Sequence, residues 1–298
     1  MRGLFVNHNQ PKCSIYECGL TFYRCLDSLN LGYYETSSED FPEGYDYYVI
    51  NYHYSATRYW SPAYIQSLPG KKISYLLETG QQNPYLLCPE VFDAYCIPDP
   101  TMREDPPVFV FPRPLSQYSL PLYEQNPFPI IGSFGFASEF KQIEDIAKQA
   151  SKEFEISVLS LHFPSDPPYG DHSDERIGEL SRSLPTNVSL KVSQSYLPKE
   201  DLIRWCSQNT VNVFWYAHDH EGLSSAATDA VSSGRPILVN GARTFRHIHK
   251  YLPYFPNIGI REAIGLGEEA VAQMRADWSP DRNLMSFQSV LQYVGMAL

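Results

Sequence analysis

Short apolar segments alternate with helix-like segments along most of the chain, and this order constrains the fold more than any other feature. In the first half, the segments typical of buried strands are GLFVN (3–7), YDYYVINY (45–52), KISYLLE (72–78), AYCIP (94–98) and VFVF (108–111). Parallel strands need a crossover connection, which is most often a helix. The alternation therefore predicts an α/β fold with parallel sheets.

Capping patterns indicate where the helices of this half begin. Ser14 and Glu17 have the spacing of a capping box, so we expect a helix to begin there, and Gly32 is its expected stop. A second helix is expected after Ser61, because Pro62 suits the first helical turn.

A proline-rich stretch separates the two halves. Residues 98–129 contain nine of the 24 prolines. Proline fixes φ and removes a hydrogen-bond donor, so regular structure is not expected here. We interpret this stretch, centred on RPLSQYSLP, as an interdomain linker.

The alternation continues beyond the linker. The expected strands are PIIGSF (129–134), EISVLSLHF, NVSLKV, VNVFWY and PILVN. The helix expected after Ser138 has one apolar face, made of Phe140, Ile143, Ala147, Ala150 and Phe154. Two strand–helix arrays joined by a linker predict two Rossmann-like domains that face a central cleft, with ligands at the carboxyl ends of the strands.

The last 19 residues predict an amphipathic helix. It begins at Pro280, and its apolar stripe consists of Leu284, Phe287, Leu291, Val294 and Leu298. Five apolar side chains on one stripe favour burial, since each one that is buried contributes about 1.5–3 kcal/mol. The second half already has its own alternating elements, so we expect this helix to pack elsewhere.

Composition narrows the classes of protein. Hydrophobic residues make up 43% of the chain, enough for a sizeable core, and the 22 tyrosines suit pockets for sugars or bases as well as ordinary packing. A net charge of −11 and a pI of about 5.2 lack the basic footprint of a nucleic-acid binder. No segment resembles a membrane span or a signal peptide, and the 6 cysteines contain no C-x-x-C pair. We expect free thiols and a cytoplasmic protein.

The stretch EGLSSAATDAVSSGRPILVN (221–240) is compatible with several functions. It can be an ordinary turn, helix and strand. Gly222-Leu-Ser224 approaches a hydrolase elbow but lacks the second glycine and does not directly follow a strand. His218, His220 and Glu221 could hold a metal, without a third histidine or cysteine at motif spacing; His247 and His249 are similarly unsupported. A helix that begins near Ser224 could also cradle a phosphate group at its N-terminus.

The fourth interpretation coincides with a family resemblance. The stretch resembles the donor-site signature of retaining glycosyltransferases with the GT-B fold (glycosyl transferases group 1-like). The matching residues are Glu221, Gly222, Asp229, Gly234 and Pro236, with aspartate in place of the family's second glutamate. In GFASEFK, Gly135 and Lys141 match the family's glycine and lysine, whereas Phe136 stands where the family has an arginine.

Three further segments resemble the family less closely. QSYLPKEDLIRWC places Tyr196 and Leu197 beside the nucleobase, and NQPKCSIYECGL places Gly19 in the glycine-containing loop after the first strand. His53, after the third expected element YDYYVINY, corresponds to the family's acceptor-domain histidine.

The resemblance implies roles for these residues. Lys141 and the N–H groups near Leu223, Ser224 and Ser225 would bind the diphosphate, Glu221 the sugar and Asp229 the ribose. The reaction would be a hexosyl transfer from a nucleotide-sugar to a hydroxyl acceptor (glycan, lipid or small molecule), with retention of configuration and without metal or cofactor. Nucleic-acid binding is not expected, and a peripheral membrane contact stays open.

The resemblance also implies the domain boundaries. Residues 1–115, with the C-terminal helix 280–298, would form the acceptor-side domain, and residues 120–279 the donor-binding domain. Phe136 leaves a non-catalytic nucleotide-sugar binder as an alternative. A GT-B sugar-nucleotide epimerase, a phosphorylase and the hydrolase also stay open.

Overall fold

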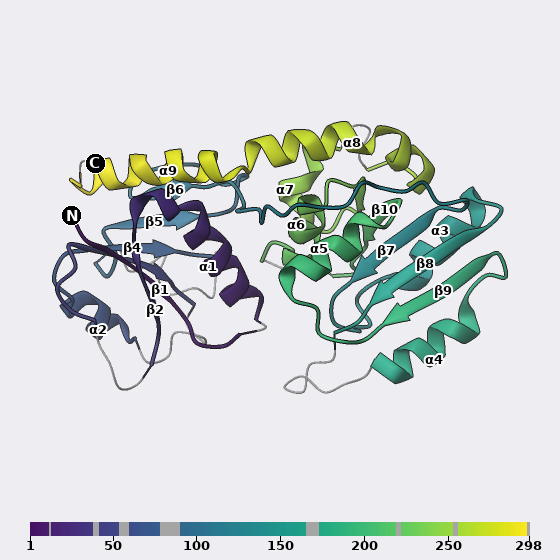
Figure 1. Cartoon of the computed structure of the whole chain (residues 1–298), viewed down its shortest axis with the longest axis horizontal. Coiled ribbons are helices and arrows are strands. Elements are labelled where there is room, and N and C mark those ends of the chain that lie inside the picture. The colour runs from purple at the N-terminus through teal and green to yellow at the C-terminus, as the bar shows by residue number, and fades with distance from the viewer. Residues whose placement is uncertain are drawn as a thin grey trace. The chain divides into compact units, whose positions relative to one another are not determined.

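The structure is a computed structural model. It describes residues 1–11, 13–37, 42–53, 60–77, 90–164, 173–218, 222–252 and 256–296. The chain divides into two compact units (Figure 1). The first consists mainly of Met1–Leu115 with Asp277–Leu298, and the second of Ser116–His220 with Ser224–Ala276.

The first unit is built on a six-stranded parallel sheet with the order β2-β1-β3-β4-β5-β6. Its strands are β1 (Gly3–Asn7), β2 (Gly32–Glu35), β3 (Tyr47–Asn51), β4 (Lys71–Tyr75), β5 (Ala94–Ile97) and β6 (Val108–Val110). Its helices are α1 (Ser14–Cys25), the 3-10 turn η1 (Asp27–Leu29), α2 (Pro62–Ser67) and α9 (Pro280–Tyr293).

The second unit is built on a five-stranded parallel sheet with the order β11-β10-β7-β8-β9. Its strands are β7 (Ile130–Phe134), β8 (Ser157–His162), β9 (Val188–Ser193), β10 (Val211–Phe214) and β11 (Ile237–Val239). Its helices are α3 (Ile143–Glu153), α4 (Ser173–Ser183), α5 (Lys199–Ser207), α6 (Ser225–Ser232), η4 (Arg243–Phe245), α7 (Arg246–His249) and α8 (Ile260–Asp277). The predicted α/β fold with two parallel sheets is confirmed.

The linker between the sheets is irregular, as its prolines predict. Residues 111–126 form neither helix nor strand. Tyr123 anchors this segment to the second unit, because its hydroxyl lies 3.0 Å from Thr210 Oγ1 and its ring stacks under the Arg235 guanidinium at 3.5 Å. The part of the linker around Tyr123 is therefore packed on the second unit.

The prediction for the first helix is wrong at both ends. Ser14 is the first residue of α1 and not its cap; Cys13 occupies the cap position and its side chain makes no capping hydrogen bond. The helix ends at Cys25, and Asn30 turns the chain with a φ of 51°. Gly32 then opens β2, an edge strand that the apolar pattern does not reveal, since its residues are half-buried or exposed.

The C-terminal helix α9 completes the core of the first unit. Phe287, Val290, Leu291 and Val294 are buried in one cluster with residues of α1 and of the sheet, and Leu284 packs at its margin. The Phe287 ring meets Phe22 of α1 edge to face at 6.0 Å. Leu298, the last residue of the predicted stripe, lies outside the described residues.

Replacing Phe287 with alanine should therefore destabilise the first unit. We expect Phe287→Ala to lower the free energy of unfolding by about 3–5 kcal/mol, because it removes a fully buried ring and leaves a cavity. Met285 lies on the exposed side of the same helix, so Met285→Ala should change it by less than about 0.5 kcal/mol. Urea denaturation measures both, and equal effects would contradict this packing.

Candidate functional site

The second sheet has a point at which the chain reverses its direction of travel. From β7 the chain proceeds through β8 to β9, and it then returns to place β10 and β11 on the other side of β7. β7 and β10 are hydrogen-bonded neighbours, with Val211 opposite Ile131. In open α/β sheets, ligands bind outside the carboxyl ends of the two strands at such a reversal. The residues after Phe134 and Phe214 therefore define the candidate site.

Gly135, directly after β7, adopts a conformation that glycine favours. Its φ is +111°, and a Cβ at this position would lie 2.3 Å from Lys141 Nζ. Lys141 Nζ donates to the carbonyl oxygen of Phe134 at 3.2 Å. The predicted pair Gly135 and Lys141 is thus one structural feature, in which the glycine makes room for the ammonium group at the end of the strand.

The loop that carries Lys141 is docked onto the residues after β10. Lys141 and Tyr216 form an antiparallel bridge, and Ala217 N donates to Phe140 O at 2.7 Å. Asn240, the residue after β11, donates from Nδ2 to Gln142 Oε1 at 2.9 Å and to Tyr216 O at 2.8 Å. One amide therefore holds the ends of three chain segments together.

The N-terminus of α6 meets this loop through Tyr216. Ser224 is the N-cap, and its Oγ accepts from Ala227 N at 3.2 Å. The same Oγ lies 3.4 Å from the Tyr216 hydroxyl, and Lys141 Nζ lies 5.9 Å from the centroid of the Tyr216 ring. The structure thus brings Gly135, Lys141 and Ser224 together around a tyrosine.

Lys141 is a buried lysine that lacks an acidic partner among the described residues. Its side chain is 5% exposed, and none of the ion pairs in the described part of the chain includes it. Burial alone lowers the pKa of its ammonium group to about 7. An uncompensated buried charge is costly, and an anion at a helix N-terminus is favoured. The site is therefore suited to an anionic ligand.

The other candidate residues of this segment lie beside the first turn of α6. Gly222 and Leu223 directly precede the cap, and Ser225 is the first residue of the helix. Glu221 lies outside the described residues, as does His220. The candidate sugar-binding carboxylate therefore has no described position.

Asp229, the predicted ribose ligand, is already paired in the structure. Its Oδ2 accepts from Lys199 Nζ at 2.7 Å, and both side chains are mostly buried. Lys199 opens α5, directly after the segment that contains Tyr196 and Leu197; Tyr196 is exposed and Leu197 is half-buried. The predicted base-binding segment and the predicted ribose ligand are thus connected through a lysine that the sequence pattern does not single out.

The predicted glycine loop of the first unit is wrong. Gly19 lies inside α1, and a Cβ there would lie 2.1 Å from Asn51 Nδ2. This close approach allows Asn51 Nδ2 to donate to Asn7 Oδ1 at 2.7 Å, across the ends of β3 and β1. Gly19 therefore has a packing role, and nothing in this geometry supports donor binding by it.

A histidine follows each of two strands of the first unit, β1 and β3. His53 is a buried residue after β3, as predicted, and its catalytic role stays a prediction. The sequence reasoning missed His8, which follows β1 and is fully buried, with no hydrogen-bond partner for Nε2. Burial, with a smaller contribution from His53 and a small opposing one from Glu35, lowers the pKa of His8 to about 4.

The sequence reasoning also missed Tyr216 and Asn240. Both fall within segments that it assigned to strands, VNVFWY and PILVN, although the strands end at Phe214 and Val239. A polar residue at the end of a predicted parallel strand is the signal that would have found them, because carboxyl ends are where ligands bind.

No metal cluster is found in the part of the chain that the structure describes. No three His, Cys, Asp or Glu residues there are grouped so as to hold an ion. His247 and His249 have other partners, with Nε2 atoms 3.3 Å from Thr228 Oγ1 and 3.0 Å from Asn240 O. Likewise, none of the described helices combines the length and the apolar character that a membrane crossing requires.

Comparison with solved structures supports the fold at low sequence identity. An alpha-glucosyltransferase in complex with UDP and a 13-mer DNA superposes with a TM-score of 0.56 at 10% identity, over 98% of this chain and 99% of that chain. The N-terminal domain of Candida albicans trehalose-6-phosphate phosphatase superposes with a TM-score of 0.61 at 8% identity, over 98% and 97%.

A third structure is longer than this chain. An S. aureus TarM mutant in complex with fondaparinux, alpha-GlcNAc-glycerol and UDP superposes with a TM-score of 0.51 at 11% identity. The match covers 92% of this chain and 59% of that chain, so this chain spans less than two thirds of its length. No protein-family model and no curated protein matches the chain. The chain has the GT-B fold that its motifs resemble.

The low pKa of Lys141 predicts how stability depends on pH. Its folded pKa is about 7 and its unfolded pKa about 10.4, so the unfolded chain binds more protons between these values. The free energy of unfolding should therefore rise with pH in this window, by about 1 kcal/mol per pH unit relative to Lys141→Met. Urea denaturation from pH 7.5 to 9.5 tests this, with exposed Lys148→Met as the control that should follow the wild type.

Proposed function

We propose that this protein transfers a sugar from a nucleoside diphosphate sugar to a hydroxyl acceptor. The observation that carries the proposal is Lys141, a buried amine with no acidic partner among the described residues, which is connected to the N-terminus of α6 through Tyr216. It lies at the reversal point of the second sheet, where such folds bind ligands. A diphosphate would provide the anion that this position lacks.

The hard step of the proposed reaction is departure of the diphosphate from an oxocarbenium-like sugar. Preorganised positive groups accelerate it by stabilising the charge that grows on the leaving oxygen. Lys141 supplies a cation, and α6 supplies the positive end of a helix dipole together with N–H groups of its first turn. The reaction then needs neither a metal ion nor a cofactor.

The remaining roles follow from the family resemblance. Glu221 would orient the sugar through its hydroxyl groups, and Asp229 would hold the ribose together with its partner Lys199. Tyr196 and Leu197 would border the base. Retention of configuration belongs to the same proposal, with the leaving phosphate as the group that takes the acceptor proton.

The proposal names a class of donor, UDP-hexoses, but leaves the class of acceptor open. The alpha-glucosyltransferase and the TarM mutant were both solved with UDP, so UDP and UDP-hexoses are the first ligands to test. The other molecules in those complexes differ from each other, and they leave the acceptor open among glycans, lipids and small molecules. The described cysteines are free thiols, which fits a reaction in the cytoplasm.

The presence of Phe136 favours a second candidate function, binding of a nucleotide-sugar without turnover. It replaces the arginine of the resembled family and is 43% exposed beside Gly135, so one cation for the leaving group is missing. A nucleotide-sugar binder without turnover would have the same fold and the same buried lysine. Donor binding without transfer to any acceptor, and without slow hydrolysis of the sugar, would favour this alternative.

Binding of UDP should take up a proton. At pH 8 the free Lys141 is mostly neutral, because its pKa is about 7, and a bound diphosphate would raise that pKa. Calorimetry at pH 8 in HEPES and in Tris should therefore reveal uptake of close to one proton. Lys141→Met should abolish the uptake and weaken binding at least about tenfold. Binding without uptake, or unchanged in the variant, would show that the anion does not reach Lys141.

The two candidate acids should separate sugar transfer from nucleotide binding. Glu221→Gln should lower kcat by about 10²-fold or more with little change in UDP affinity, since the proposed contact is with the sugar. Asp229→Asn preserves shape beside Lys199 and should instead weaken UDP binding by about tenfold. Initial rates with UDP-hexoses and UDP titrations measure both, and the reverse pattern would contradict the assignment.

A further inference from the structure

One face of the second sheet is only partly covered by helices. The crossovers α3 and α4, between β7, β8 and β9, pack on the face that carries Leu159, Leu161 and Leu190. The chain then returns through α5 and α6, and a right-handed return places these helices on the opposite face. They lie over β7, β10 and β11, and on the same face Lys191 in the middle of β9 is exposed, whereas Ser160 of β8 is buried.

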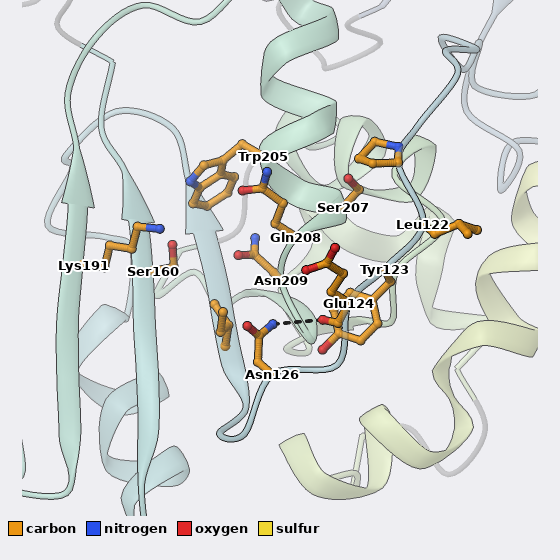
Figure 2. A pocket seen from close by; sticks show the side chains of 12 residues that line it. Leu122, Tyr123, Glu124, Asn126, Ser160, Lys191, Trp205, Ser207, Gln208 and Asn209 are labelled. Atoms are coloured by element: carbon orange, nitrogen blue, oxygen red, sulfur yellow. Dashed lines mark hydrogen bonds between the residues drawn. The ribbon is translucent and has the colours of Figure 1, made fainter.

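The open side has polar side chains. Successive residues of a strand point to opposite faces, so Ser160 and Lys191 lie opposite the apolar residues, and they are direct partners in the β8–β9 ladder. A pocket forms over this pair (Figure 2). Its lining comes from β8, β9, the end of α5 with the residues that follow it, and the linker segment 121–126.

The linker wall of the pocket is held in place. Tyr123 is fixed by its hydrogen bond to Thr210 and by the Arg235 guanidinium that stacks on its ring. Thr210 Oγ1 also accepts from Ile130 N at 2.9 Å, so this hydroxyl ties the wall to the start of β7. Asn126 Nδ2 donates to the carbonyl oxygen of Glu124 at 3.3 Å, which closes the segment on itself.

The inner part of the pocket depends on a glycine in β7. A Cβ on Gly132 would lie 2.0 Å from Asn209 Nδ2, so the absence of a side chain lets Asn209 lie against the sheet. Asn209 Nδ2 donates to Asn212 Oδ1 at 2.8 Å, and the carbonyl oxygen of Asn209 accepts from Arg235 Nε at 3.1 Å. The pocket is therefore largely preformed.

The side chains that converge on the pocket have a distinctive chemistry. Figure 2 shows the Trp205 ring, the amides of Gln208 and Asn209, the Lys191 ammonium and the Glu124 carboxylate around one space. In the described part of the chain, neither Lys191 nor Glu124 forms an ion pair. One charge of each sign disfavours an ionic ligand, and the polar lining disfavours an apolar one.

The geometry points to a binding site for a neutral saccharide. Aromatic faces pack against the apolar C–H side of a sugar ring, while amide and carboxylate groups bond to neighbouring hydroxyls. The site is centred away from Lys141: Ser160 and Lys191 lie level with Gly132 of β7, roughly 10 Å along the strand from Gly135 at 3.3 Å per residue, and the Trp205 ring of the lining meets the Phe134 ring edge to face at 6.1 Å. It does not depend on the proposed transfer reaction.

Saturation-transfer NMR with maltopentaose, cellopentaose and chitopentaose tests this site. At least one of them should bind with a Kd of about 1 mM or below. The double variant Glu124→Ala/Gln208→Ala should weaken that binding about tenfold or more. Gln125→Ala is the matched control, since Gln125 is an exposed neighbour in the same linker segment outside the lining, and it should bind like the wild type.

Four results would overturn the proposal. They are no binding by any of the three oligosaccharides at ~10 mM, equal binding by the double variant and the control, displacement of the oligosaccharide by saturating UDP, and binding of adenosine in place of the saccharides. Both substituted side chains are exposed, so the fold should be retained, and a thermal melt of each variant verifies it.

Discussion

The parallel pairing of β7 with β10 is the constraint on which the rest of the second unit depends. It forces the chain to return past β7 after β9, and it brings Gly135 and Tyr216 to the same edge of the sheet. It also directs α6 toward that edge, where Ser224 reaches the Tyr216 hydroxyl. The same return places α5 and α6 on one face only, where Lys191 of β9 is exposed and Ser160 of β8 lines the pocket. Both sites proposed above are consequences of one topological step.

The buried charged residues of the second unit differ in whether an opposite charge lies beside them. Asp229 and Lys199 compensate each other at 2.7 Å, whereas Lys141 forms no ion pair with any described residue and donates to a carbonyl oxygen beside an aromatic ring. The whole chain has a net charge of −11, which repels a diphosphate at long range. A local cation in a desolvated position can outweigh that repulsion, because interactions between charges are stronger where water is excluded.

The sequence predicted those features that depend on local spacing. The family resemblance singled out Gly135 and Lys141, which are only six positions apart, so one short loop brings them together in the structure. The apolar stripe of α9 was likewise predicted from the sequence, because helical periodicity is a local property. Features that depend on distant segments were missed: Asn240 is joined to Gln142, and Lys199 to Asp229, only after the sheet has formed.

Gly19 shows why a glycine alone is weak evidence for a binding loop. The family resemblance placed Gly19 in a glycine-containing loop, but Gly19 lies inside α1. The space beside it is filled by Asn51, whose Nδ2 donates to Asn7 Oδ1 and to the carbonyl oxygen of Ile15 at 3.0 Å. The amides of Asn7 and Asn51 therefore bond to each other at this end of the first sheet, while Nε2 of the buried His8 has no partner among the described residues and the pKa of His8 is lowered to about 4. The strand ends of the first unit carry charges of both signs, with Glu35 at the end of β2 and the buried Asp99 and Arg113 after β5 and β6, whereas the buried Lys141 reaches the end of β7 in the second unit. The position of Lys141 suits the proposed reaction, because the departing diphosphate needs a positive charge where its negative charge grows.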